Sequence, residues 1–255
     1  MVQAAARYTA LTLAFVTWLS ISPVAASSLH VLVGLHKPPY IDLTSNSGYE
    51  IELMELIGAH MGVHVNFTHV PNGRIGETLS ADAFDASSLQ KEETGPNDYY
   101  YSCPYIQYQN MVVTRQQDRL TINSLEDLLG LSVLAFQTAN IVLGEDFSNA
   151  IERAEDYNET VDQSAQVEML LRGRVQAIVI DRNILNHYLL TSDNPSPLNR
   201  LTIATTNYQV AFKDPNLRDR FNEAQSQVWQ TPEYQELQQK YFGDINQNLE
   251  MFCEV

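Results

Sequence analysis

The sequence has few cysteines, few basic residues and only one long apolar run. Cys103 and Cys253 are its two cysteines in 255 residues, and neither has a CxxC or Cys/His neighbour, so the sequence supports no zinc site. Lys and Arg number 15 against 31 Asp and Glu, which gives a net charge of −16 at pH 7. Nucleic acid and anionic membrane surfaces are poor partners for so acidic a chain.

Motifs of catalysis are also missing. The six histidines form no HExxH motif, and there is neither a GxSxG motif nor a P-loop. Glu92, Glu93 and Asp181 are carboxylates capable in principle of acid–base work, but no sequence feature marks any of them with a perturbed pKa. We therefore expect a binding protein rather than an enzyme, with no cofactor and no metal.

The long apolar run lies at the N-terminus. Residues 8–22 (YTALTLAFVTWLSIS) follow Arg7 and precede Pro23-Val24-Ala25-Ala26, which predicts a signal peptide over residues 1–26, cleaved after Ala26. The run is shorter than the roughly 20 residues of a bilayer span, and an uncleaved anchor is the alternative. Export would bring Cys103 and Cys253 into an oxidising compartment, where they either pair or remain two thiols.

After residue 26, apolar β-branched segments alternate with segments of helical periodicity. We expect strands at 29–35, 63–68, 84–88, 111–114, 132–136, 175–180, 201–204 and 209–212. We expect helices at 49–61, near 75–80, after Ser124, after Thr138, at 163–172, and two within 217–241. This alternation predicts an α/β fold with a mainly parallel sheet, and no fixed-period repeat competes with it.

Polar residues gather where several of these strands end. They are His36 to Tyr40 (HKPPY), Ser87 to Gly95 (SSLQKEETG), Thr138 to Asn140 (TAN), and Asp181 at the end of an apolar strand. Ligands of parallel α/β units bind at the carboxyl ends of strands, where loops and helix N-termini offer free N–H groups. The shared placement makes these segments candidates for one binding site.

Each candidate also has a structural interpretation. Tyr40 is either a ligand platform or a loop cover, and Ser87 and Ser88 can satisfy local backbone groups. Asp181 can cap a helix beginning near Arg182. Lys91 belongs to a charged run that is usually solvated, and Arg74 follows Asn72-Gly73 at a helix start, where the helix dipole does not favour a cation.

Several segments, in this order, resemble the bacterial extracellular solute-binding proteins of the polar amino-acid type, which serve ABC importers. They are LVGLHKPPY (32–40), GYEIEL (48–53), SLEDLLG (124–130), RGRVQAIVID (172–181), and Glu233 to Gly243 with its closing KYFG. The resemblance implies two Rossmann-like lobes joined by two crossing strands, with a hinge that closes on a small solute. It places lobe 1 at residues 27–114 and 205–255, and lobe 2 at 115–204.

The same resemblance implies a periplasmic protein, which we expect to be a monomer, with a small-molecule solute and an ABC permease or a membrane sensor as partners. It implies that Tyr40 stacks on the solute, and that Ser87, Ser88 and Gln90 contact it from lobe 1. Thr138, Asn140 and Asp181 would contact it from lobe 2. A Cys103–Cys253 disulfide would be compatible with this arrangement, because both ends of the mature chain would belong to lobe 1.

Two positions depart from the family pattern. Gly95 stands where the family has an arginine that grips the α-carboxylate of the ligand, and Glu92 replaces a threonine. Nothing adjacent offers the same planar donor fork, so Lys91, Arg74 or Lys37 would have to supply another cation, or the ligand lacks an α-carboxylate. An exported cyclohexadienyl or arogenate dehydratase on the same fold is the alternative function, with Glu92 or Asp181 as general acid.

Overall fold

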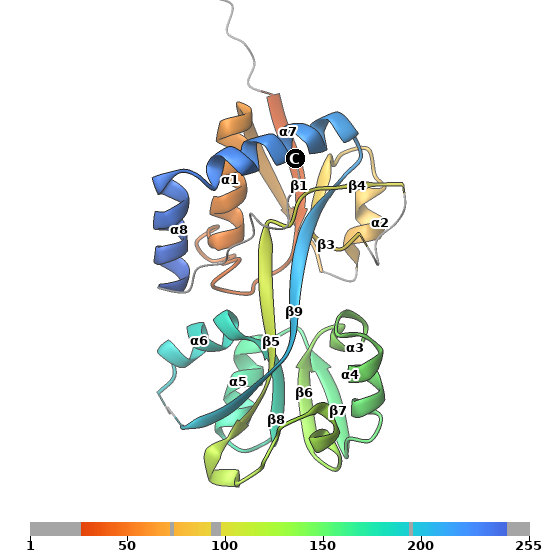
Figure 1. The fold of residues 1–255 in the computed structure, drawn as a ribbon, viewed down its shortest axis with the longest axis vertical. Helices are drawn as coiled ribbons and strands as arrows, with labels where there is room; N and C mark the ends of the chain where they lie inside the picture. Colours follow the sequence, from red (N-terminus) through yellow and green to blue (C-terminus); the bar gives the residue numbers. More distant parts are fainter. Residues whose placement is uncertain (1–26, 72–73, 93–97, 194–195, 244–255) are drawn as a thin grey trace, which may run out of the picture.

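The protein consists of two α/β lobes, one above the other, joined by two long strands (Figure 1). The structure is a computed structural model and describes residues 27–71, 74–92, 98–193 and 196–243. The predicted signal peptide, Gly95 and Cys253 lie outside these residues, so the predictions about them remain predictions. In the described part of the chain no helix has the length and apolarity that a membrane crossing needs.

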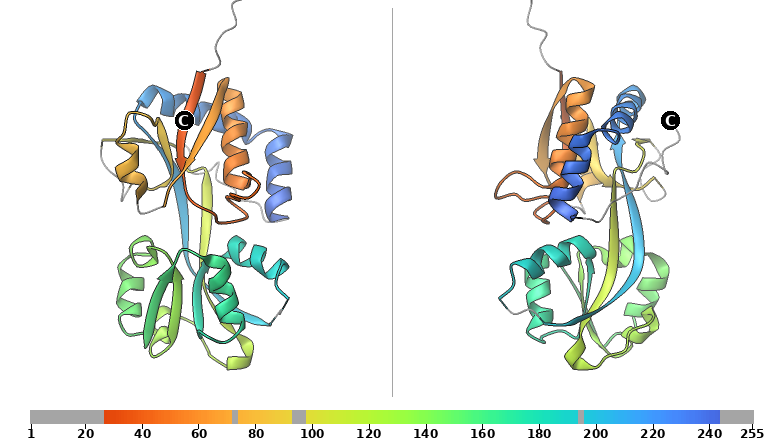
Figure 2. Two further views of the ribbon diagram at one scale, coloured as in Figure 1. Left: turned by 180° about the vertical axis from the view of Figure 1, so that it is seen from behind. Right: turned by 60° about the vertical axis from the view of Figure 1, so that its left-hand side comes forward.

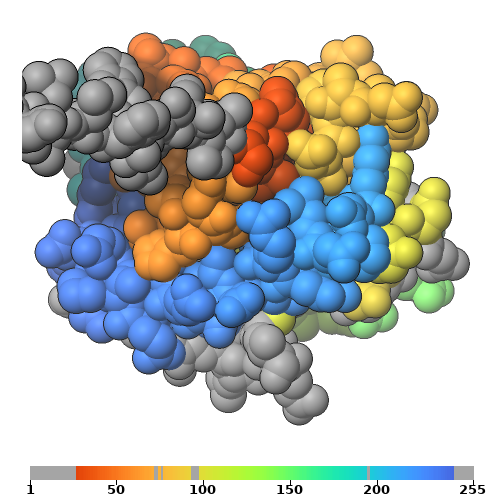
Figure 3. All heavy atoms as spheres, turned by 90° about the horizontal axis from the view of Figure 1, so that it is seen from above, coloured from red at the N-terminus to blue at the C-terminus, as the bar shows by residue number. Residues whose placement is uncertain are grey.

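Lobe 1, the upper lobe of Figure 1, is built from the two ends of the described chain. Its elements are β1 (Ser27–Val33), α1 (Tyr49–Met61), β2 (Val63–His69), α2 (Ile75–Leu79), β3 (Ala86–Gln90), β4 (Tyr100–Tyr101), α7 (Pro215–Val228) and α8 (Pro232–Phe242). Strand β1 pairs in parallel with both β2 and β3. Figure 3 shows α7 and α8 (blue) beside α1 (orange), so three helices from distant parts of the sequence cover one side of the lobe.

Lobe 2, the lower lobe, is formed by the middle of the chain. Its elements are η2 (Gln116–Asp118), η3 (Leu125–Leu128), β6 (Ser132–Phe136), α3 (Ala139–Val142), α4 (Gly144–Ile151), β7 (Asp156–Thr160), α5 (Gln163–Leu171), β8 (Ala177–Asp181) and α6 (Arg182–Leu190). Strand β6 pairs in parallel with β7 and β8. Every residue of β8 is buried, which agrees with the continuous apolar run seen in the sequence.

Two strands, β5 (Ile106–Arg115) and β9 (Leu198–Phe212), connect the lobes (Figure 2). They pair with each other in antiparallel fashion along most of their length. In lobe 1, β9 also pairs with β3, and in lobe 2, β5 also pairs with β8. The separate strands predicted at 201–204 and 209–212 are therefore one strand of 15 residues. The expectation of a mainly parallel sheet holds within each lobe, whereas the crossing strands are antiparallel to their neighbours.

Local sequence signals explain several element boundaries. Gly62 ends α1 in the left-handed conformation (φ 71°), and Thr231 begins α8 by accepting a hydrogen bond from the Tyr234 N–H. Ser124 and Asp127 form a reciprocal capping box at the start of η3, where the sequence predicted a helix N-cap.

Candidate functional site

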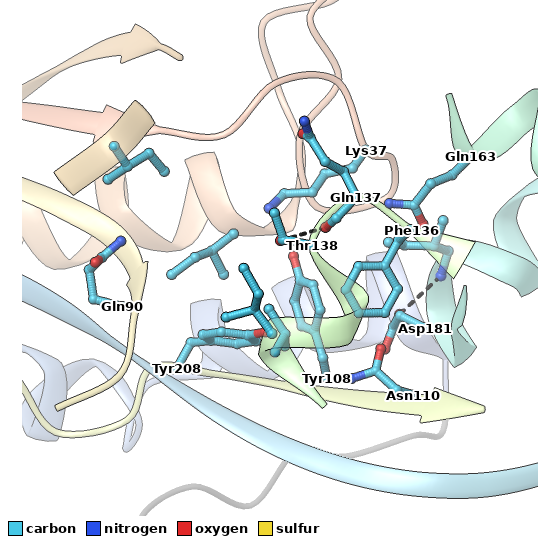
Figure 4. A pocket seen from close by; sticks show the side chains of 15 residues that line it. Lys37, Gln90, Tyr108, Asn110, Phe136, Gln137, Thr138, Gln163, Asp181 and Tyr208 are labelled. Carbon is cyan, nitrogen blue, oxygen red and sulfur yellow. Dashed lines mark hydrogen bonds between the residues drawn. The ribbon is translucent and has the colours of Figure 1, made fainter. Parts of the chain in front are cut away.

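A cavity of about 430 Å³ lies between the two lobes, beside the crossing strands (Figure 4). Lobe 1 contributes Lys37, Ile75, Leu89 and Gln90, and the crossing strands contribute Tyr108, Asn110 and Tyr208. Lobe 2 contributes Phe136, Gln137, Thr138, Ile141, Val142, Gln163, Asp181 and Ile184. The ends of β1, β3, β6 and β8 all reach this cavity, which is where the sequence placed polar candidate segments.

Four polar atoms, one on each of four residues that line the cavity, are buried beneath its surface and have no hydrogen-bond partner in the protein. They are Lys37 Nζ, Tyr108 OH, Asn110 Nδ2 and Gln163 Oε1. Buried polar groups in folded proteins are almost always paired, because desolvating such a group without a partner costs about 1–3 kcal/mol. A mixed wall of this kind, apolar with a few convergent polar groups, suits a small polar ligand.

Asp181, at the carboxyl end of β8, is the acid of the described cavity wall. Its Oδ1 accepts hydrogen bonds from the N–H groups of Asn183 and Ile184, which makes it the N-cap of α6. The same oxygen accepts the Tyr40 hydroxyl (3.1 Å), and Oδ2 accepts the Gln109 N–H (2.9 Å). Burial raises the pKa of Asp181 to about 6, against the lowering effect of these donors. The predicted capping role and the cavity position thus coexist in one residue.

Asp181→Asn is expected to change how stability depends on pH. Because the pKa of Asp181 rises from 3.8 to about 6 on folding, the native state binds the proton more tightly than the unfolded state. The stability that this proton contributes is complete below pH 3.8 and is lost as the pH rises through 6, by up to about 3 kcal/mol. Denaturant unfolding of both proteins from pH 4 to 7 should show the wild type losing stability relative to the variant. A difference that does not vary with pH would contradict this assignment.

Tyr40 lies beneath the cavity rather than in its wall. Its side chain is fully buried and stacks on Tyr108, with ring centroids 4.3 Å apart and planes inclined by 19°. Its hydroxyl donates to Asp181 and accepts from Asn183 Nδ2 (3.0 Å). Tyr40 therefore joins lobe 1 to lobe 2, and Tyr108 lies between Tyr40 and the cavity.

The candidates after β3 divide into two groups. Gln90 lines the cavity and its Nε2 donates to the Ser88 carbonyl oxygen (2.9 Å). Ser87 and Ser88 are fully buried, and neither residue is part of the described cavity wall. Lys91 is half-buried and Arg74 is exposed, and both lie outside that wall. Of this group, the structure brings only Gln90 to the cavity.

The candidates before α3 contact a carboxylate of the protein itself. The N–H groups of Thr138 and Asn140 donate to Glu159 Oε2 (2.6 Å) and Oε1 (3.1 Å). The Tyr157 hydroxyl donates to the same carboxylate (2.6 Å), and burial together with Glu159 raises the pKa of Tyr157 well above its usual value. Thr138 lines the cavity, whereas Asn140 is exposed and lies outside the wall. The N–H groups that the start of α3 would otherwise offer to a ligand, those of Thr138 and Asn140, are thus already bonded to Glu159.

Sequence reasoning missed most of the crossing-strand contribution. Tyr108, Asn110 and Tyr208 line the cavity, but the strand was expected to begin only at Met111. The missed signal was alternation: Ile106, Tyr108 and Asn110 are buried, whereas the two glutamines between them are partly exposed. Gln137 and Gln163, also in the wall, lie in segments that were assigned to a strand end and a helix start.

Cys103 lies just before β5, with its N–H donating to Asn222 Oδ1 in α7 (2.9 Å). Its predicted partner Cys253 is outside the described residues, so the disulfide stays a prediction. The described residues contain no cluster of three or more His, Cys, Asp or Glu side chains that would hold a metal ion.

Comparison with known structures identifies the two-lobe architecture. An ancestral arginine-binding protein bound to glutamine superposes with a TM-score of 0.70 at 22% identity, covering 86% of this chain and 99% of its own. An ABC uptake transporter substrate-binding protein from Streptococcus pneumoniae with bound histidine gives 0.70 at 21%, covering 85% and 93%. An ancestral amino-acid-binding protein, a precursor of cyclohexadienyl dehydratase, gives 0.69 at 19%, covering 85% and 96%. At these identities the likeness establishes the fold.

The family follows from the sequence itself. No curated protein matches the chain. A family match, however, covers residues 29–244, nearly all of the described structure, and it agrees with the resemblance carried by the segments LVGLHKPPY and RGRVQAIVID. The similar structures also include an arginine-, lysine-, histidine-binding protein from Geobacillus stearothermophilus. The chain belongs to the bacterial extracellular solute-binding proteins, family 3.

Proposed function

We propose that this protein captures one small, polar, amino-acid-like solute between its two lobes, in the periplasm, for uptake or sensing. The observation that carries the proposal is that four residues lining one cavity, Lys37, Tyr108, Asn110 and Gln163, each hold a buried polar atom without a partner in the protein. These atoms come from lobe 1, from a crossing strand and from lobe 2. A polar solute that pairs with them would stabilise the closed arrangement of the lobes.

The ligands bound to structurally similar proteins support the solute class. Glutamine and histidine are bound in two of them, and both are small polar amino acids. A volume of about 430 Å³ accommodates a molecule of this size. We further propose that residues 1–26 are cleaved as a signal peptide, that the mature protein is a monomer, and that it delivers the solute to an ABC permease or a membrane sensor.

We also propose domain limits at residues 27–114 and 205–255 for lobe 1, and 115–204 for lobe 2. Both limits fall inside crossing strands, within β5 and within β9. A crossing strand is the natural place for a boundary, because few other contacts pass between the lobes there.

Catalysis is the less supported function. A dehydratase would need Glu92 or Asp181 as general acid. Glu92 is exposed and lies outside the cavity wall, and Asp181 already accepts four hydrogen bonds that fix it in position. We propose that the protein is not an enzyme. Incubation with prephenate or arogenate, followed by assay for phenylpyruvate or phenylalanine, tests this, and turnover would refute it.

The binding proposal is tested by identifying the solute. The protein is purified without refolding, any bound solute is released with acid and analysed by mass spectrometry, and the emptied protein is then screened by thermal shift. The screen covers amino acids, organic acids, amines and short peptides. We expect at least one compound of the first two classes to raise the melting temperature. No co-purifying solute and no stabilising compound would refute the proposal.

A further inference from the structure

The family resemblance predicts that Gly95 stands where the family has an arginine for the ligand carboxylate. Three cations could compensate on sequence grounds: Lys37, Arg74 and Lys91. The structure separates them, because Lys37 alone of the three lines the cavity. Among the described residues of the cavity wall, it is also the one cationic side chain.

The ammonium group of Lys37 is shielded from solvent within the cavity wall. The residue is 6% exposed, its Nζ has no hydrogen-bond partner, and it lies 5.6 Å from the centre of the Tyr108 ring (Figure 4). Backbone hydrogen bonds fix its loop, because the Lys37 N–H donates to the Ile41 carbonyl and its own carbonyl accepts from the Tyr40 and Ile41 N–H groups. A buried ammonium without a partner is costly, since lysine has three donors to satisfy.

Two acids lie near Lys37 without pairing with it directly. The electrostatic attraction of Glu50 and Asp181 opposes burial, which lowers the pKa of Lys37. Glu50 is fully buried, its Oε1 accepts the Tyr105 hydroxyl (3.1 Å), and its Oε2 has no partner. Asp181 is committed to its four donors. The acids therefore favour the charged form of Lys37 while leaving its N–H groups available to the cavity.

The start of α3 in lobe 2 is an unfavourable place for an anionic group of the solute. At the start of α3, the Glu159 carboxylate already accepts the N–H groups of Thr138 and Asn140. A solute carboxylate near these amides would be repelled by Glu159 and would find the two donors occupied. The described wall thus has an unpartnered ammonium on one side and a protein carboxylate just behind the opposite side.

We propose that Lys37 binds a carboxylate of the solute above the ring of Tyr108, as the substitute for the arginine that the chain lacks. The assignment rests on the proposed solute-binding function and specifies its substrate class: an organic acid or amino acid whose carboxylate faces lobe 1. Asn110 Nδ2 and the Tyr108 hydroxyl are further unpartnered groups in the same wall that can complete the coordination of a polar solute.

The test compares Lys37→Met with Arg74→Met and Lys91→Met, two matched controls whose cations lie outside the cavity wall. Titration calorimetry measures binding of L-glutamate, succinate and L-histidine, of L-histidinamide, which lacks a carboxylate, and of putrescine. We expect at least one carboxylate probe to bind the wild type, and Lys37→Met to weaken that probe by about 10- to 100-fold. The two control variants should bind it within about twofold of the wild type.

Each outcome separates this inference from the function on which it rests. If putrescine or histidinamide bound most tightly of all probes, and Lys37→Met bound it with the same affinity as the wild type, the role of Lys37 would be overturned. Solute binding itself would stand. Binding of no carboxylate probe would also overturn it, and failure of the whole thermal-shift screen would refute solute binding as well. Should Lys37→Met not fold, the Lys37→Met/Glu50→Gln pair removes both buried charges. In that double variant, an affinity for the carboxylate probe equal to that of the wild type would contradict the proposal.

Discussion

Asp181→Ala is expected to lower the free energy of unfolding by about 2–4 kcal/mol at neutral pH and to abolish solute binding. The carboxylate receives donors from three places, namely Tyr40 in the loop after β1, Gln109 in β5, and the first turn of α6. Alanine removes the cap of α6 and leaves the Tyr40 hydroxyl and the Gln109 N–H without their charged acceptor. Part of this loss is offset, because the alanine variant no longer buries the charge of the Asp181 carboxylate in the folded state.

Asp181→Asn is the control for that experiment, because its amide oxygen can still cap α6. Urea unfolding at pH 7 should rank the wild type and the asparagine variant above the alanine variant. Equal stability of the alanine and asparagine variants would show that the hydrogen bonds of Asp181 contribute little. Solute binding that survived in Asp181→Ala would show that this residue has no role in the site.

Gly48→Ala is expected to cost about 3–5 kcal/mol, the largest effect of any change proposed for this protein. Gly48 has φ 126° and ψ 160°, a conformation that residues with a Cβ atom rarely adopt. An added methyl group would lie 2.6 Å from the Tyr40 carbonyl carbon and closer still to its oxygen. The loop would have to move, although the Tyr49 and Glu50 N–H groups hold it through Pro39 and Tyr40. Lys37 is part of that loop, so binding should weaken too.

Gly62→Ala provides a matched comparison at the other end of α1. Gly62 also has a positive φ of 71°, but nothing lies within 4 Å of the position of its added methyl group. The change should therefore cost only about 1 kcal/mol, the strain of the backbone alone. Thermal denaturation of both variants measures the difference. Similar losses for the two would show that the close approach of Gly48 to Tyr40 is unimportant.

The sequence predicts the fold well because its strongest signals are local. The helix expected at 49–61 is α1 residue for residue, and the strand expected at 132–136 is β6. Strand β7 was missed because its sequence, DYNET, is polar and none of its residues is fully buried. Helix α4 was likewise not separated from α3, since only Leu143 and the positive φ of Gly144 mark the break.

The site was predictable in position but not in its contacts. That the ends of β1, β3, β6 and β8 would converge followed from the parallel arrangement, and all four reach the cavity. Which residue of HKPPY faces the solute depends on how the loop packs, and the aromatic residue lies below the wall while the lysine lies in it. Likewise, no short-range pattern connects Glu159 to the amides of Thr138 and Asn140, which it meets only because β7 pairs with β6.

The path of β9 also determines the order in which the two lobes can be completed. When the chain reaches Tyr208 in β9, it has supplied every strand and helix of lobe 2, and β5 has its partner. Lobe 1 still lacks the residues of β9 that pair with β3, and it lacks α7 and α8, which pack on α1. Closing that lobe joins segments more than 100 residues apart, with the larger loop entropy that this implies. When the chain is synthesised from its N-terminus, lobe 2 is therefore completed first, as a contiguous unit. Lobe 1, which carries Lys37, is completed last.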